Sequence, residues 1–290
     1  MAQILIAGCG YVGSALAARL HDAGHRVLGL KRSAGGLPEG VIALRADLAD
    51  ADSLAAALAG VTAPIDVSVY AVAADASDDV AYRRAYVEAQ RNLLVALRAR
   101  DPMPKHVFFT SSTAVYAQGD GSWVDETSET TPHDFRGVRM LEAERVLGES
   151  GIPGTALRLG GIYGPGRTRL IESVRNGRAT LRPGAPRWGN RIHRDDAAGA
   201  LGHLIEMALR GTAPPPILIG VDDEPADEAV VLRWLAEALG VAMPVVDDAM
   251  PGVRERGSNK RCSNARLRGT GYRFRHPSFR EGYGALINAP

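Results

Sequence analysis

Three glycines near the start of the chain have the spacing of a dinucleotide-binding turn. Gly8, Gly10 and Gly13 follow the apolar run QILIA and open an apolar segment of helical period. In a G-x-G-x-x-G turn the first glycine permits the tight bend, the second lets the backbone approach a pyrophosphate, and the third lets strand and helix pack closely. The helix N-terminus then faces the anion. We therefore expect the cofactor to contact Gly8, Gly10, Tyr11, Val12 and Gly13.

The end of the second apolar run indicates which dinucleotide binds. About twenty residues beyond the glycines, an NAD-binding protein usually offers a carboxylate to the ribose hydroxyls. This chain offers Lys31, Arg32 and Ser33 instead. A carboxylate would repel a 2′-phosphate, whereas two cations and a hydroxyl can bind it through charge-assisted hydrogen bonds. We expect NADP, with NAD the less favoured cofactor; the alternative is that these are solvated loop charges.

A segment between residues 167 and 194 concentrates positive charge. It holds eight arginines and one carboxylate, a local excess of +7 in a chain whose formal charge is +1. The planar guanidinium suits phosphate and carboxylate groups. We expect an anionic small-molecule substrate, such as a nucleotide-sugar or another phosphorylated metabolite, with Arg167, Arg191 and His193 among its contacts. Pairing with nearby acids or solvation is the alternative. Nucleic acid is not expected, because only one aromatic residue accompanies these charges.

The elements that must position these residues alternate along the chain. Short apolar runs predict strands, and stretches of helical period separate them. Such alternation requires an α/β fold, a Rossmann-type doubly wound parallel sheet with helices on both faces. The expected strands are QILIA, HRVLGL, IDVSVYAV, KHVFFT, GTALRL and PILIG, and the expected helices cover 12–22, 51–59, 78–99, 136–149, 196–209 and 227–239.

The third expected helix has a clear apolar period. Tyr82, Tyr86, Ala89, Leu93 and Leu97 recur at steps of three or four residues, which predicts one buried face. We therefore expect the two tyrosines in the hydrophobic core, without a chemical role.

Two irregular regions interrupt the alternation. Residues 166–194 and 241–290 are rich in Gly, Pro and Arg. Ligands of open α/β sheets bind beyond the carboxyl ends of the strands, where late irregular segments commonly fold over the edge. We expect a dinucleotide-binding domain over 1–165, with sheet and helix returns at about 195–240, and a smaller substrate-binding lobe formed by 166–194 and 241–290.

The bulk composition excludes several classes of protein. Apolar residues make up 46% of the 290 residues, and no apolar stretch reaches membrane-spanning length. The start of the chain lacks the pattern of an export signal. The two cysteines, Cys9 and Cys262, have no metal-ligand spacing. We expect a cytoplasmic protein with neither a metal nor a membrane partner.

Several motifs resemble one superfamily. The segments RADLAD, SVYAVAADAS, FFTSSTAVY, LRLGGIYGPGR and NRIHRDDAAGAL occur in this order behind the glycine turn. Together they resemble the extended branch of the short-chain dehydrogenase/reductase superfamily, often labelled NAD-dependent epimerase/dehydratase, over nearly the whole chain. The resemblance implies homodimers formed through the helices near 78–99 and 136–149. It also implies adenine contacts from Asp47 and Leu48, a cofactor lining from Ala71, Val72 and Ala73, and an active-site serine at Ser112.

The same resemblance implies a Tyr-x-x-x-Lys pair that this chain lacks. In the superfamily the pair transfers a proton, because the ammonium and the nicotinamide ring favour the phenolate. Counting on from Ser112, these positions hold Phe135 and Arg139. Phenylalanine has no exchangeable proton, whereas Arg139 could still orient the cofactor. The combination resembles atypical subgroups that keep the cofactor glycines without the intact catalytic set.

A displaced group or water would then have to supply the proton. We expect a non-standard catalytic set of Ser112, which would polarise the reacting oxygen, with Arg139 and Tyr163. Other side chains in segments expected to border the site are Tyr116, Asp125, Glu126, His133 and His193.

Two functions from different classes fit these observations. The first is an NAD(P)-dependent oxidoreductase or epimerase-like enzyme that acts on an anionic substrate. The second is an NADP-binding sensor or regulatory protein that transfers no hydride, because fold and activity are separable. The basic segment favours the enzyme, since a sensor of the cofactor alone has no need of it.

Overall fold

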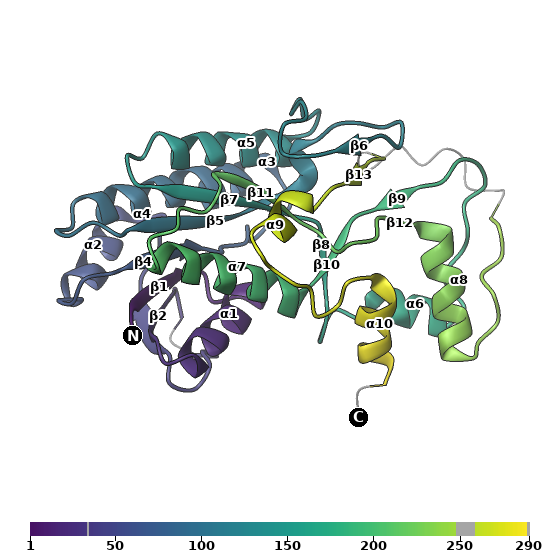
Figure 1. Ribbon diagram of the computed structural model, residues 1–290, viewed down its shortest axis with the longest axis horizontal. Coiled ribbons are helices and arrows are strands. Elements are labelled where there is room, and N and C mark those ends of the chain that lie inside the picture. Colours follow the sequence, from purple (N-terminus) through teal and green to yellow (C-terminus); the bar gives the residue numbers. More distant parts are fainter. Residues whose placement is uncertain (34, 248–258, 289–290) are drawn as a thin grey trace.

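A computed structural model of the chain describes residues 1–33, 35–247 and 259–288. Its centre is a parallel sheet of seven strands in the order β3-β2-β1-β4-β5-β7-β11 (Figure 1). The direction of strand addition reverses between β1 and β4, as in a Rossmann-type doubly wound sheet. The expected fold class is confirmed. The strands are β1 (Gln3–Ala7), β2 (Arg26–Lys31), β3 (Ile42–Arg45), β4 (Val67–Tyr70), β5 (His106–Ser112), β7 (Gly154–Leu159) and β11 (Ile217–Gly220).

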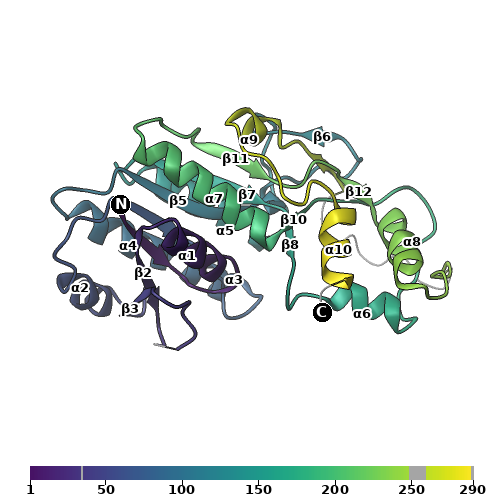
Figure 2. The same cartoon turned by 60° about the horizontal axis from the view of Figure 1, so that its bottom comes forward.

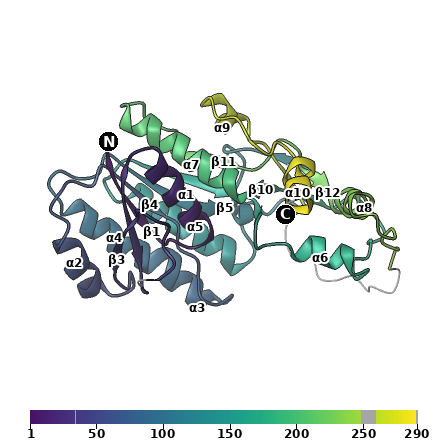
Figure 3. The ribbon, with the colours of Figure 1, turned by 90° about the horizontal axis from the view of Figure 1, so that it is seen from below.

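Helices cover both faces of this sheet. Figure 3 shows α1 and α7 on one side and α2, α3 and α4 on the other. Ile4 and Ile6 of β1 pack in the core beneath α1 and α7, whereas Leu5 belongs to the core on the opposite face. A strand buried on both faces needs apolar residues throughout, which explains the uninterrupted run QILIA. The helices of the sheet domain are α1 (Tyr11–Asp22), α2 (Ala51–Ala59), α3 (Asp79–Tyr82), α4 (Ala89–Arg98), α5 (Phe135–Gly148) and α7 (Arg194–Leu209).

The helix expected over 78–99 contains a change of pitch. A π-helical segment, η1 (Arg83–Glu88), joins α3 to α4. Leu93 and Leu97 on α4 are buried as expected. Tyr82, the last residue of α3, and Tyr86, within η1, are only half-buried, and both line a cavity. Both tyrosines pack against the edge of the hydrophobic core as well, so the expectation of core positions holds only in part. The regular helical period does not continue through η1.

A smaller lobe lies beyond the carboxyl edge of the sheet (Figure 2). It has its own apolar core, in which Ile171, Leu235 and Phe279 come from three different helices. The structure places α8 in this lobe, whereas the expected boundary put residues up to 240 with the sheet. The expected lobe segment 241–290 includes residues 248–258, which lie outside the described residues. The lobe helices are α6 (Arg169–Arg175), α8 (Glu228–Leu239) and α10 (Phe279–Ile287).

Short paired strands and turns connect the two parts. The pairs are β8 (Gly161–Tyr163) with β10 (Arg191–His193), β9 (Trp188–Gly189) with β12 (Ala226–Asp227), and β6 (Trp123–Val124) with β13 (Arg261–Cys262). The short helix η2 (Thr113–Val115) follows β5, and α9 (Ala265–Gly269) packs against the sheet domain. None of the helices in the described part of the chain has the length and apolar character that crossing a bilayer requires.

A buried carboxylate anchors the return of the chain from α9 to the lobe. Asp196 in the first turn of α7 is fully buried. One of its oxygens accepts hydrogen bonds from Tyr272 Oη at 3.0 Å and the Arg275 backbone amide at 2.6 Å. The other accepts from the His276 backbone amide at 2.9 Å and His276 Nδ1 at 2.8 Å. These four donors compensate the buried charge and fix residues 272–276, which lead into α10.

The same carboxylate lies close to two histidines, and the three side chains together have the atom types that can bind a metal ion. His193, Asp196 and His276 each offer one such atom, and these atoms lie within 4.8 Å of one another. Both oxygens of Asp196 are already occupied by the four donors just described, and His193 Nδ1 accepts a hydrogen bond from the Asp195 amide at 3.2 Å. The group therefore fits a structural anchor.

A second buried charge lies beneath the carboxyl edge. Arg158 of β7 forms hydrogen bonds to both oxygens of Glu144 on α5, at 2.9 and 2.7 Å. Both side chains are more than nine-tenths buried. Arg158 also donates to Tyr116 Oη at 2.7 Å, and the Ser111 hydroxyl donates to Glu144 at 2.6 Å. This network ties α5 to the neighbouring strands β5 and β7.

Removal of this carboxylate should destabilise the fold strongly. Glu144→Ala leaves Arg158 buried without its counter-ion, and breaking a buried pair in this way costs about 3–5 kcal/mol. The free energy of unfolding in urea measures the loss. Glu142→Ala on the same helix is the matched control, because its partially exposed pair with Arg139 contributes about 1 kcal/mol or less. Equal losses for both variants would show that the Arg158 pair has no special weight.

Candidate functional site

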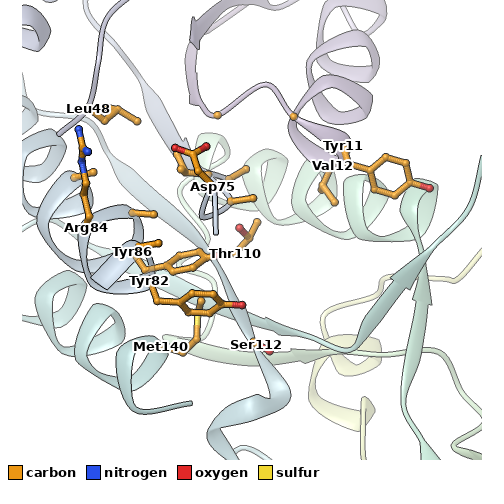
Figure 4. Close-up of a pocket in the computed structure, with 18 of the residues that line it drawn as sticks. Tyr11, Val12, Leu48, Asp75, Tyr82, Arg84, Tyr86, Thr110, Ser112 and Met140 are labelled. Carbon is orange, nitrogen blue, oxygen red and sulfur yellow. The ribbon is translucent and has the colours of Figure 1, made fainter. Parts of the chain in front are cut away.

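The main cavity of the described chain opens at the switch point of the sheet. It encloses about 850 Å³, and the ends of β1, β2, β4 and β5 form its floor (Figure 4). The segment from α3 to α4 and the start of α5 form one wall, and residues 159–167 form another. Cofactor sites of open α/β sheets lie at this position, and the volume suits an extended ligand.

The glycine turn fits a dinucleotide. Gly8 has a φ of 95°, and a Cβ there would lie 2.7 Å from the Ala71 backbone. At Gly13 a Cβ would lie 2.1 Å from the Gly8 carbonyl oxygen, so strand and helix can pack only without it. Gly10 forms the N-cap of α1 and faces open space, since a Cβ would meet no atom within 4 Å. This leaves room for an anion at the helix N-terminus, and the site fits a nicotinamide dinucleotide.

The adenosine end of the cavity carries both signs of charge. Lys31, Arg32 and Ser33 line it as expected, and so do Asp47 and Leu48. Sequence reasoning missed Asp75. Its carboxylate accepts two hydrogen bonds from Arg32, at 2.7 and 2.6 Å, which lowers the pKa of Asp75.

The opposite end of the cavity contains the expected serine. Ser112 lines it with Thr110 and Ser111. The Ser112 hydroxyl accepts a hydrogen bond from the Ala114 amide at 3.1 Å and so caps η2. That bond fixes the side chain at the end of β5 and leaves its own proton available to another acceptor.

The start of α5 presents a different pair of residues to the cavity from the expected one. Arg136 and Met140, spaced by four, line it, whereas Phe135 and Arg139 do not. Arg139 pairs with Asp79 through two hydrogen bonds, at 2.7 and 2.8 Å, and these raise its pKa. This position lies between α5 and α3 and differs from the expected one beside the nicotinamide ribose. The helix begins at an N-cap, where the Gly137 amide donates a hydrogen bond to the Asp134 carboxylate at 3.1 Å.

Three other predicted site residues lie at the junction with the lobe. Tyr163 is buried against Tyr283, with ring centroids 4.5 Å apart, and against His193 at 5.4 Å. Burial raises the pKa of Tyr163 and lowers that of His193 to about 4. Neither residue lines the cavity, nor does Arg191. Their positions therefore differ from those expected for a proton donor and two substrate contacts.

Arg167 is the one arginine of the basic segment that lines the cavity in the described chain. Its guanidinium lies 4.0 Å from the ring centroid of Tyr11, whose hydroxyl donates to the Pro165 carbonyl at 3.0 Å. Contacts of this kind hold the wall of the lobe against the glycine turn. Several other arginines pair with nearby acids, as Arg175 does with Glu172 and Arg194 with Asp195.

Sequence reasoning missed several residues of the cavity lining. Asp75 and Asp78 lie in a loop, and Arg136 lies in α5. Tyr82 in α3 and Tyr86 in η1 were expected in the core and not in the site. Arg136 and Met140 repeat the spacing of four expected for the catalytic pair, one residue later than the count from Ser112 placed it. That spacing was the only available signal. The cofactor lining expected from β4 is present, at Ala71, Val72 and Ala73.

The fold and the cavity together define a dinucleotide-binding protein of the Rossmann type. The sequence pattern of the NAD dependent epimerase/dehydratase family matches residues 4–220, and the chain belongs to this family. This confirms the resemblance and the expectation of an NAD(P)-dependent epimerase/dehydratase-like or reductase-like enzyme with a nicotinamide cofactor, and it disfavours the sensor alternative.

Three similar proteins extend the comparison. A solved structure from Methylobacillus flagellatus, described as a candidate NAD-dependent epimerase/dehydratase, superposes with a TM-score of 0.82 at 41% identity and covers 99% of this chain and 97% of its own. A 3-diazoavenalumate denitrifying reductase of a Streptomyces species is 27% identical over 97% of this chain and 99% of its own length. A 2-alkyl-3-oxoalkanoate reductase of Stenotrophomonas maltophilia is 29% identical over 86% and 78%, respectively.

A single methyl group at Gly10 should separate cofactor binding from folding. Because a Cβ at Gly10 meets no protein atom, Gly10→Ala should fold with an unchanged melting temperature. The methyl would occupy the space of the pyrophosphate, so we expect NADPH affinity to fall about tenfold or more, which is about 1.4 kcal/mol. Fluorescence titration measures the affinity. Gly148→Ala, also open and far from the cavity, is the control; equal affinities in both variants would contradict the assignment.

Proposed function

We propose that the protein is an NADP(H)-dependent oxidoreductase that reduces the carbonyl group of a small anionic substrate at a non-standard active site. The observation that carries the proposal is the set of cations at the end of β2, in the place where an NAD-binding protein usually offers a carboxylate. The bound cofactor would supply a hydride. The residues that would hold it are those of the glycine turn, Lys31 to Ser33 and the end of β4.

The preference for NADP is supported by the surroundings of Arg32. Its side chain is largely exposed at the cavity, and its partner Asp75 is exposed as well. An exposed pair of this kind contributes little to stability, so a 2′-phosphate can replace Asp75 as the partner of the guanidinium. Lys31 lies beside it, with its ammonium on the Gly35 carbonyl at 2.9 Å. Arg45 adds a third cation, because its Nε donates to the Arg32 carbonyl at 3.2 Å.

The anionic substrate is supported by two arginines in the walls of the cavity. Arg136 comes from α5 and Arg167 from the lobe, and both side chains are exposed to the cavity. A carboxylate or phosphate between these walls would find a forked donor. Ser112 would donate a hydrogen bond to the reacting oxygen. The name of one relative, a 2-alkyl-3-oxoalkanoate reductase, supports carbonyl reduction as the reaction.

The cofactor half of the proposal is tested by titration with NADPH and NADH. We expect the wild type to bind NADPH about tenfold or more tightly, about 1.4 kcal/mol, and Lys31→Ala/Arg32→Asp to reverse the preference, because the variant puts a carboxylate opposite the 2′-phosphate. Asp75→Asn is the control and should keep the preference, since it removes only the competing anion. If neither NADPH nor NADH binds at micromolar concentration, the proposal is overturned.

The substrate half is tested with two probe aldehydes of similar size. With saturating NADPH, the protein should oxidise the cofactor faster with p-carboxybenzaldehyde than with p-tolualdehyde, because only the first carries an anion for Arg136 and Arg167. The absorbance of NADPH reports the rate. A variant carrying Arg136→Gln and Arg167→Gln should lose the difference, and equal rates in the wild type would contradict an anionic substrate.

A further inference from the structure

Three tyrosines line the cavity, and they differ in what their hydroxyls do. Tyr11 donates its hydrogen bond to Pro165 at the glycine turn. Tyr86 accepts a hydrogen bond from the Ala74 amide at 3.4 Å, and burial raises its pKa. The hydroxyl of Tyr82 makes no hydrogen bond with any other described residue. Figure 4 shows Tyr82 projecting from α3 with this hydroxyl directed toward the region of Thr110 and Ser112.

Tyr82 also lies against the residue that replaces the family tyrosine. The rings of Tyr82 and Phe135 meet edge to face, with centroids 5.2 Å apart and planes at 89°. Phe135 stands at the start of α5, outside the cavity lining, whereas Tyr82 stands inside it. A phenol that reaches the cavity from Tyr82 therefore enters beside the place from which a tyrosine at position 135 would enter.

We propose that Tyr82 is the catalytic acid of this protein and supplies the proton that the family obtains from a tyrosine at the start of α5. The inference rests on the proposed carbonyl reduction. Phe135 is then a positioning residue, because its ring supports the aromatic side chain of Tyr82 from α5. Such edge-to-face pairs contribute about 0.5–1.5 kcal/mol beyond their buried area.

Reduction of a carbonyl needs a hydride and a proton. The cofactor, when bound, would supply the hydride that forms the new C–H bond at the carbonyl carbon. As the C=O π electrons move to oxygen, Tyr82 Oη gives that oxygen its proton, so the substrate leaves as an alcohol. Ser112 donates a hydrogen bond to the same oxygen. The tyrosinate that remains takes a proton from solvent, which reaches it because Tyr82 is only half-buried.

Two charged groups, Arg136 and Asp78, line the same cavity as Tyr82. On α5, the guanidinium of Arg136 lines the same cavity and lies 4.7 Å from the ring centroid of Phe135. Its positive charge therefore lies beside Phe135, whose ring packs on the ring of Tyr82. On the other side, Asp78 caps α3 with its side chain on the Ala81 amide at 2.8 Å, so part of its charge is taken up by the helix N-terminus. Arg136 thus places a permanent positive charge in the same cavity as the Tyr82 hydroxyl.

The other candidate donors are less suited by position. Tyr116 is buried, with its hydroxyl between Arg158 and the Asp125 carbonyl. Tyr163 is buried at the lobe junction, and His133 is exposed. None of the three lines the cavity.

A spectroscopic titration tests the proposal without a substrate. Ionisation of tyrosine changes its ultraviolet absorbance, so the difference between wild type and Tyr82→Phe reports the ionisation of Tyr82. Saturation with NADP⁺ brings the positive nicotinamide ring into the cavity. We expect it to shift this titration to lower pH by about one unit or more, as a nearby opposite charge does. Tyr86→Phe is the matched control and should keep the shift.

Steady-state kinetics give a second test, in which a further substitution should restore part of the lost activity. With NADPH and p-carboxybenzaldehyde, Tyr82→Phe should lower kcat about 100-fold, the usual contribution of a general acid, without changing the dissociation constant of NADPH. Phe135→Tyr added to Tyr82→Phe should recover part of kcat, because it returns a phenol to the family position. A merely structural role for Tyr82 would instead change NADPH binding or the melting temperature.

The outcomes separate this inference from the proposed function. If NADP⁺ binds and shifts the titration of Tyr82, the inference is supported. If NADP⁺ binds and the titration does not move, Tyr82 is not at the nicotinamide and the inference is overturned, while the proposed function stands. If neither NADP⁺ nor NADPH binds, both are overturned.

Discussion

The compensation of one buried charge determines how the two parts of the molecule are joined. Asp196 lies in the first turn of a helix that belongs to the sheet domain, yet the four donors that satisfy its carboxylate come from the segment leading into α10. A buried carboxylate without these donors would be strongly unfavourable, so the segment is held at one position. From there α10 supplies Phe279 and Tyr283 to the core of the lobe. This attachment also supports the second wall of the cavity, because Tyr163, which lies within residues 159–167, packs on Tyr283.

Local signals carried most of what the sequence could predict. The glycine turn, the buried strands and the cations at the end of β2 each depend on residues close together in the chain, and their geometry is nearly independent of the rest. The side chains at the reacting end were harder to find. Which residues of α5 face the cavity depends on how the helix packs in the folded chain, and a count of residues from Ser112 misses the inward positions, Arg136 and Met140, by one. The partners of Arg139 and Arg32 come from loops and helices that only the folded chain brings near.

The family match and the altered catalytic positions describe different levels of the molecule. Family membership is carried by the sheet and the cofactor turn, which the fold itself requires. Phe135 and Arg139 each have a structural partner, the ring of Tyr82 in one case and Asp79 in the other. Fold and catalytic groups are separable, because the chemistry of a proton donor depends on its position in space and not on its position in the sequence.

The π-helical segment between α3 and α4 gives the protein an unusual kind of variability. A wider turn accommodates one residue more than an α-helical turn does, so the residues before it are offset in phase from those after it. Each residue turns a regular helix by about 100°. An insertion or deletion of one residue within Arg83–Glu88 would thus exchange the side chains that α3 presents to the cavity, while α4 stayed packed on the sheet through Leu93 and Leu97. Related chains could in this way change their reacting groups by length rather than by substitution, and an alignment without gaps would not reveal it.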